Sequence, residues 1–175
     1  MGTQRRVWLP FVALVGLLGS LLTWERATAV AAPFAYIANA DDNTVSVLDT
    51  ASNIVISTVP VGLLPGAVAV NAAGTRAYVV NGCGAIPCDG THGSVSVIDT
   101  ASNTVTATVT VGGEPAGVAL NVAGTRVYVV NGCDDSDATC FGGMPRQPGT
   151  VSVIDSATNT VVGTVGGVGQ VVEKI

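Results

Sequence analysis

Short runs in which apolar and small polar residues alternate occur along most of the chain. Residues 44–49 read Thr-Val-Ser-Val-Leu-Asp, and residues 94–99 and 150–155 repeat this pattern with conservative changes. A period of two residues places alternate side chains on opposite faces, which is the pattern of a β-strand. The same runs lack the helical period of 3.6 residues, and β-branched residues dominate them. The pattern therefore predicts strands separated by turns.

Further elements recur in the same order around these runs. A Tyr-to-Asn run occupies residues 36–39, 78–81 and 128–131, a run that begins with Pro occupies 65–71 and 115–121, and Ala-Gly-Thr-Arg occupies 73–76 and 123–126. Units of about 40 to 50 residues that hold four short strands are typical of β-propeller blades. We expect Val, Ile, Leu and Ala, rather than aromatic residues, to pack the blade faces. Tyr78 and Tyr128 should lie at equivalent positions in adjacent blades.

Turn residues separate the predicted strands. Residues 49–53 read Asp-Thr-Ala-Ser-Asn, in which Asp can accept a backbone hydrogen bond two residues on and Asn tolerates a left-handed conformation. Gly74 and Gly124 fit the positive-φ position of a short hairpin. Pro65 and Pro115 break the chain between the last strand of one blade and the first strand of the next.

These motifs resemble the repeats of the YVTN family of β-propellers, which are WD-repeat-like propellers. The resemblance covers residues 34 to about 165, and it fails after the third unit, where no further Pro-led strand follows. It implies an all-β fold, a partial β-propeller of about three four-stranded antiparallel blades. From the N-terminal residues themselves we expect a signal helix before the blades. The units would span about residues 34–75, 76–125 and 126–165, with an irregular tail at 166–175. The resemblance also implies an exported or surface protein but no single activity, because propellers host many functions.

The N-terminus has the three parts of a secretory signal peptide. Two arginines precede an apolar stretch at residues 7–22, and Ala-Thr-Ala follows at 27–29. We therefore expect residues 1–29 to be removed and residues 30–175 to be exported to the periplasm, the cell surface or the medium. The alternative is an uncleaved segment that holds the chain in a membrane. Pro10 and several small residues disfavour it, because a spanning helix needs about 20 predominantly apolar residues.

The charge of the chain limits the classes of partner. The formal net charge is −5, with 7 basic and 12 acidic residues. After the expected signal peptide, the basic residues are Arg76, Arg126, Arg146 and Lys174. Because they form no basic stripe, we expect no nucleic-acid partner. A hydrophobic fraction of 48% with only 11% charged residues also argues against general disorder.

All four cysteines fall between a Tyr-led strand and the Val-Ser-Val strand that follows it. Cys83 and Cys88 lie in the second unit, and Cys133 and Cys140 lie in the third. Exported proteins meet an oxidising compartment, in which paired cysteines are normally bridged. We therefore expect local disulfides, Cys83–Cys88 and Cys133–Cys140, that shape two protruding loops. These loops are the best candidates for a binding surface. A four-cysteine metal site is the alternative.

Few residues offer catalytic or metal-binding chemistry. His92 is the only histidine, so neither a Ser-His-Asp triad nor a site with several His ligands is indicated. Asp134, Asp135 and Asp137 can supply oxygen ligands for Ca²⁺, but their spacing is not that of an EF-hand loop. A solvated acidic loop is the favoured interpretation. We expect no metal, no cofactor and no enzymatic activity.

The leading hypothesis is an exported, non-catalytic propeller module that binds a protein, a glycan or a small ligand through its loops. Two alternatives stay open: a fragment or subunit of a periplasmic propeller-type redox enzyme, and a structural element of a surface layer. Known propellers have about four to eight blades, so about three blades leave an open arc with bare edges. We expect either a fragment of a longer propeller, which the abrupt decay of the repeat favours, or a homo-oligomer in which two chains give about six blades.

Overall fold

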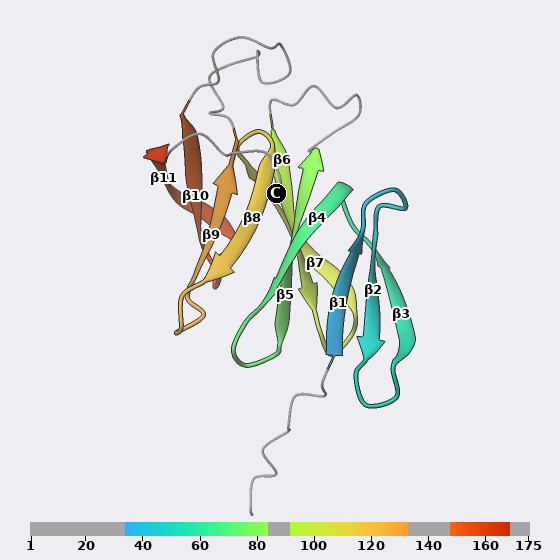
Figure 1. The fold of residues 1–175 in the computed structure, drawn as a ribbon. Coiled ribbons are helices and arrows are strands. Elements are labelled where there is room, and N and C mark those ends of the chain that lie inside the picture. The colour runs from blue at the N-terminus through green and yellow to red at the C-terminus, as the bar shows by residue number, and fades with distance from the viewer. Residues whose placement is uncertain (1–33, 84–91, 133–147, 169–175) are drawn as a thin grey trace, which may run out of the picture.

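The computed structural model describes residues 34–83, 92–132 and 148–168. In these ranges the chain forms eleven β-strands and no helix. The strands form three antiparallel sheets that stand side by side (Figure 1). No segment of the described chain forms a helix that could cross a membrane. The expected signal peptide at residues 1–29 lies outside the described residues.

Each sheet is one blade, and its strands pair in chain order. The first blade consists of β1 (Phe34–Asn39), β2 (Thr44–Asp49) and β3 (Ile54–Pro60). The second consists of β4 (Leu63–Val70), β5 (Arg76–Cys83), β6 (Gly93–Asp99) and β7 (Thr104–Val111). The third consists of β8 (Pro115–Leu120), β9 (Arg126–Asn131), β10 (Gly149–Asp155) and β11 (Thr160–Val168). The expected fold, an all-β partial propeller with antiparallel blades, is confirmed.

The blades are offset by one strand from the sequence units. The second and third blades each begin with the Pro-led strand, β4 or β8, and the Tyr-led strand follows it. The third blade has four strands because its first strand, β8, comes from residues that the sequence pattern assigns to the second unit. The first blade has three strands, and the described chain contains no Pro-led strand beside β1. β11 continues to Val168, beyond residue 165 where the repeat pattern decays.

The hairpins have the geometry that their residues predict. Oδ1 of Asp49 accepts hydrogen bonds from the N–H groups of Ala51 and Ser52, at 2.8 and 3.1 Å. Asn53 then closes the turn with a positive φ of 57°. The turns after β6 and β10 repeat these bonds. Gly74 has a φ of 68°, as the hairpin between β4 and β5 requires.

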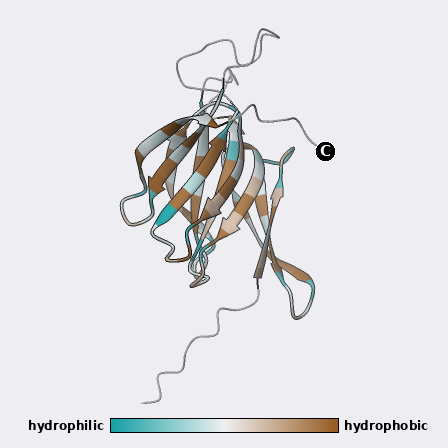
Figure 2. Cartoon of the chain, turned by 60° about the vertical axis from the view of Figure 1, so that its left-hand side comes forward, coloured by the Kyte–Doolittle hydropathy of each residue, from teal (hydrophilic) through white to brown (hydrophobic). Residues whose placement is uncertain are grey.

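Two apolar layers lie between the three blades. The layer between the first and second blades contains Val45, Val47, Val59, Ala77, Val79 and Ile98. The layer between the second and third contains Tyr78, Val80, Val95, Val97, Val109, Val111, Val127, Val129 and Ile154. Figure 2 shows the resulting alternation of hydrophobic and hydrophilic positions along the strands. The expectation that mainly aliphatic residues pack the blade faces is confirmed for the described chain: Tyr78 is the aromatic residue among the buried members of these layers, and Phe34 and Tyr36 pack against the first layer while partly buried.

Every blade has two faces of different composition. We call the face toward the next blade in chain order the forward face, and the opposite one the backward face. In the second blade, Tyr78 and Val97 belong to the forward face, whereas Ala77 and Val79 belong to the backward face. Both of its faces are buried, because a blade lies on either side.

The burial of the repeated tyrosine depends on its blade. Tyr78 and Tyr128 hold the same register, since Tyr78 pairs with Ala69 and Val97 and Tyr128 pairs with Ala119 and Val153. Tyr78 is fully buried, but Tyr128 is 39% exposed. The expected equivalence therefore holds for position and fails for burial. The reason is that no described blade covers the forward face of the third blade.

Candidate binding surface

The antiparallel connections divide the molecule into two ends. The tight hairpins within the blades lie at the lower end in Figure 1, which we call the hairpin end. The opposite end, which we call the loop end, holds the linkers between blades and the strand ends that the β1–β2, β5–β6 and β9–β10 connections join (Figure 1). Cys83 closes β5 and His92 immediately precedes β6, so both lie at the loop end.

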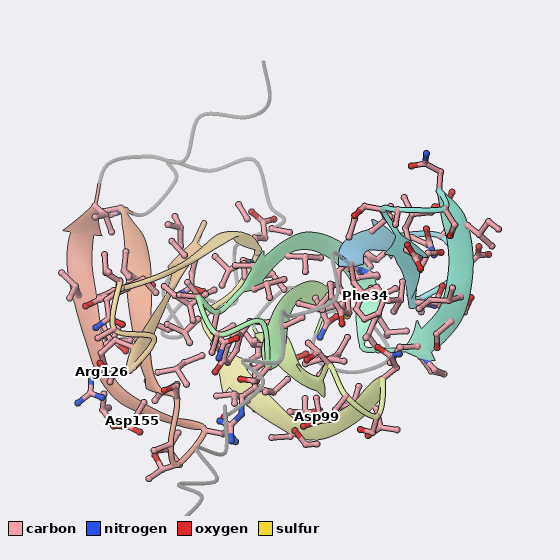
Figure 3. The ribbon with its side chains drawn as sticks, turned by 90° about the horizontal axis from the view of Figure 1, so that it is seen from below. Phe34, Asp99, Arg126 and Asp155 are labelled. Carbon is pink, nitrogen blue, oxygen red and sulfur yellow. The ribbon has the colours of Figure 1, made fainter. Side chains whose placement is uncertain are left out.

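The carboxylates of the hairpin end are used by the fold. A hydrogen bond from the backbone N–H of Ser102 is the main reason that the pKa of Asp99 lies below its ordinary value. The N–H of Ala157 has the same effect on the pKa of Asp155. Oδ2 of Asp155 also lies 2.6 Å from Nη1 of Arg126, and Figure 3 shows the two side chains at this end. These acids stabilise turns, so they are poor candidates for ligand contacts.

Side chains at the hairpin end also connect successive blades. Oη of Tyr36, in the first blade, donates to Oδ1 of Asn103 in the second blade at 3.5 Å. Burial, together with the nearby charge of Asp99, raises the pKa of Tyr36. Nη1 of Arg76, in the second blade, donates to the carbonyl of Ser156 in the third. The forward side of a blade thus reaches the Asp-to-Asn turn of the next blade.

At the loop end, every blade contains the same polar triad. Nδ2 of Asn81 donates to the hydroxyls of Ser94 and Ser96, at 3.0 Å each, and all three side chains are buried. The counterparts are Asn131 with Thr150 and Ser152, and Asn39 with Thr44 and Ser46. An amide that bonds two hydroxyls of the neighbouring strand fixes the register where the two strands open into their connection.

The linkers between blades rest on these triads. A Cβ at Gly112 would lie 2.8 Å from Cγ of Asn131, so a larger residue does not fit. Leu64 at the start of β4 and Glu114 just before β8 each precede the proline of their repeat, and they have positive φ angles of 52° and 49°. The carbonyl of Glu114 accepts a hydrogen bond from the N–H of Gly132 at 3.0 Å. The loop end is therefore a close-packed frame that holds its backbone in sparsely populated conformations.

Of the residues singled out from the sequence for disulfide, metal or catalytic chemistry, the structure describes Cys83 and His92, and both lie at the loop end. Cys83 is 3% exposed and disulfide-bonded. His92 is exposed. Outside the described residues lie Cys88, Cys133, Cys140, Asp134, Asp135 and Asp137. Within the described ranges, no group of three or more His, Cys, Asp or Glu side chains is placed to hold a metal ion.

Sequence reasoning missed the polar triads, although their signal was present. An Asn closes each Tyr-led strand, and a hydroxyl residue precedes each of the two valines that follow in the next strand. In the sequence these hydroxyl residues read as the ordinary polar positions of an alternating strand. Only the register, which places Asn81 opposite Ser94, shows that they share a partner.

No protein-family model matches the chain, and no curated protein matches it. Several solved structures are similar. Hydrazine synthase from Kuenenia stuttgartiensis superposes with a TM-score of 0.62 and 22% identity, over 76% of this chain and 34% of that one. The dihydro-heme d1 dehydrogenase NirN has a TM-score of 0.58 and 19% identity, over 80% of this chain and 26% of that one.

A structure described as the Dos1 propeller is also similar, with a TM-score of 0.51 and 10% identity. The similar region covers 70% of this chain and 27% of the Dos1 propeller chain. The chain thus spans only 26–34% of the length of these three structures. Likeness at such low identity shows the fold alone, and it agrees with the stacked blades: the described chain has the fold of a partial β-propeller.

Proposed function

We propose that this chain is an exported, non-catalytic repeat module of the YVTN type that binds a protein or glycan partner through its loop end. The observation that carries the proposal is the contrast between the two ends. Three copies of one polar triad, buried in the second and third blades and partly buried in the first, support connections of very different length, at residues 40–43, 84–92 and 132–148. Variable loops on a rigid scaffold are the usual arrangement of a binding surface.

The uniform turns of the hairpin end also favour the loop end as the binding surface. Its turns repeat one set of Asp-to-backbone bonds in all three blades. Repeated contacts of this kind stabilise each blade and give no surface that distinguishes one partner from another. We therefore place the ligand contacts at the loop end.

The disulfides belong to this proposal. We propose that Cys83 pairs with Cys88 and Cys133 with Cys140, so that each long connection is closed on itself. Peptide mapping without reduction is the test. The expected result is two local pairs, whereas free thiols or a bridge between the two connections would refute this arrangement.

The function itself is tested by a loop graft. Residues 132–148 are replaced by residues 40–43, the connection that the same frame carries in the first blade. Val122→Lys, at the 96% exposed hairpin-end position, is the matched control. Glycan arrays and capture of envelope proteins are compared for the parent, the graft and the control. We expect binding by the parent and the control only; equal binding by a folded graft would contradict the proposal.

One alternative has an observation in its favour. Two of the similar structures are named as a synthase and a dehydrogenase, so the chain is alternatively a fragment or subunit of a propeller-type redox enzyme. Absorbance spectra and metal analysis of the purified chain decide between the two functions. A stoichiometric chromophore or transition metal would favour the redox enzyme.

A further inference from the structure

The forward face of the third blade is apolar, and no other blade of the described chain covers it. Tyr128 and Val130 are 39% and 37% exposed, whereas their counterparts Tyr78 and Val80 are 0% and 1% exposed. Val153, opposite Tyr128, is only half-buried. These side chains are the ones with which the second blade packs against the third.

The backward face of the first blade is uncovered as well. Ile37 is 43% exposed, but the equivalent side chains of the other two blades, Val79 and Val129, are fully buried. Leu48 is half-buried, in contrast to its buried counterpart Ile98. The polar triad of Asn39 on this face is likewise only partly buried.

The two uncovered faces complement one another. Within the molecule, a forward face packs against a backward face twice, first between the first two blades and again between the second and third. Within the chain, the second and third blades meet the blade before them largely through their Pro-led strands, β4 and β8, which the first blade lacks. The chain therefore carries one further forward face and one further backward face, the latter formed by the strands of the first blade alone. Two forward faces, in contrast, would oppose one Tyr128 to another, an arrangement with no counterpart in the fold.

One polar contact between blades also has possible partners on the two uncovered faces. Tyr36 of the first blade bonds Asn103 in the turn of the next blade. Tyr78, at the junction between the second and third blades, makes no such bond. Tyr128 holds the same repeat position on the uncovered forward face, where it would meet a turn of the form Asp-to-Asn. The first blade presents such a turn, which ends at the exposed Asn53 with its φ of 57°.

We propose that a second copy of this chain docks head to tail, with its first blade against the forward face of the third blade. A two-fold axis through the centre of the resulting ring makes both junctions identical. Two copies give about six blades, within the range in which propellers close. Each junction would pair a forward face with a backward face, as the two junctions within the chain do, with Ile37 and Leu48 of the first blade on the backward side.

The mass of the purified chain in solution tests the proposal, by light scattering over a range of concentrations. We expect the mass of two chains for the parent. Tyr128→Lys and Ile37→Lys each introduce a charge on one face and should each give the mass of one chain. The control Val122→Lys, away from both faces, should keep two chains. Circular dichroism establishes that the variants are folded, and Val130→Lys replaces Tyr128→Lys if that variant is not.

A mixture of the two variants tests the direction of docking. A pair made of one Tyr128→Lys chain and one Ile37→Lys chain keeps one intact junction, whereas neither variant alone can form any. Mixing should therefore restore association in part. A folded parent that stays a single chain at every concentration overturns the proposal, and so does an Ile37→Lys variant that associates like the parent.

Discussion

Tyr36, Tyr78 and Tyr128 occupy one repeat position, yet their surroundings differ. Tyr78 is fully buried between two blades, and its hydroxyl has no hydrogen-bond partner in the structure. Tyr128 has lost one side of that environment and is 39% exposed. The contribution of a residue in a repeat protein is thus decided by its neighbours as much as by its identity.

Replacing Tyr78 by Ala should destabilise the fold by about 3–5 kcal/mol, because a buried ring is removed from the layer between two blades. Tyr128→Ala should cost only about 1–2 kcal/mol in dilute protein, since its ring is partly hydrated already. Urea denaturation measures both. Tyr78→Phe keeps the ring and removes an unpaired hydroxyl, so it should lie within about 1 kcal/mol of the parent. Equal losses for the two Ala variants would contradict this account.

The triad amides allow a second comparison at this scale. Asn81→Ala leaves two buried hydroxyls without their donor and should cost about 1–3 kcal/mol. Asn39→Ala removes the same bonds from a partly buried triad, where water can replace them, and should cost less. The denaturation midpoints of the two variants measure the difference. A larger loss for Asn39→Ala would be inconsistent with the burial of the two triads.

At the scale of the element, strands and turns could be predicted from the sequence, and their grouping could not. Alternation gave the strands, and the Asp and Asn residues gave the turns, because both signals are local. The offset between sequence unit and blade depends on non-local pairing. β8 and β9 pair in one blade, although the boundary between the second and third sequence units lies between them. The triad of Asn81 was missed for the same reason, since it depends on register between strands.

The hairpin acids make stability depend on pH. The pKa values of Asp99 and Asp155 are lowered, mainly by hydrogen bonds from backbone N–H groups of their turns. Their stabilising effect is therefore complete above the unfolded pKa of about 4 and is lost as the pH falls through the folded values. The urea concentration at the denaturation midpoint should therefore decrease as the pH is lowered below about 4. In the Asp99→Asn, Asp155→Asn double variant this decrease should be smaller. Identical slopes would show that these turns do not contribute.

At the scale of the whole molecule, residues 34–83, 92–132 and 148–168 form a stack of three blades, and among these blades only the second has both faces covered by another. Its fold class could be predicted because the repeat is visible in the sequence. The exposure of Ile37 and Tyr128 could not, because a repeat pattern states what a face contains and not what covers it. Stability should accordingly be greatest in the middle blade and decrease toward both ends.

Hydrogen exchange resolved to single strands tests this central claim most directly. It is measured on the Ile37→Lys variant, in which the proposed junction between copies is disrupted, so that the single chain is observed. The account predicts the slowest exchange in β5 and β6, faster exchange in β2 and β9, and the fastest in β11, whose residues are all exposed. Uniform protection across the three blades, or the slowest exchange in the first or third, would contradict it.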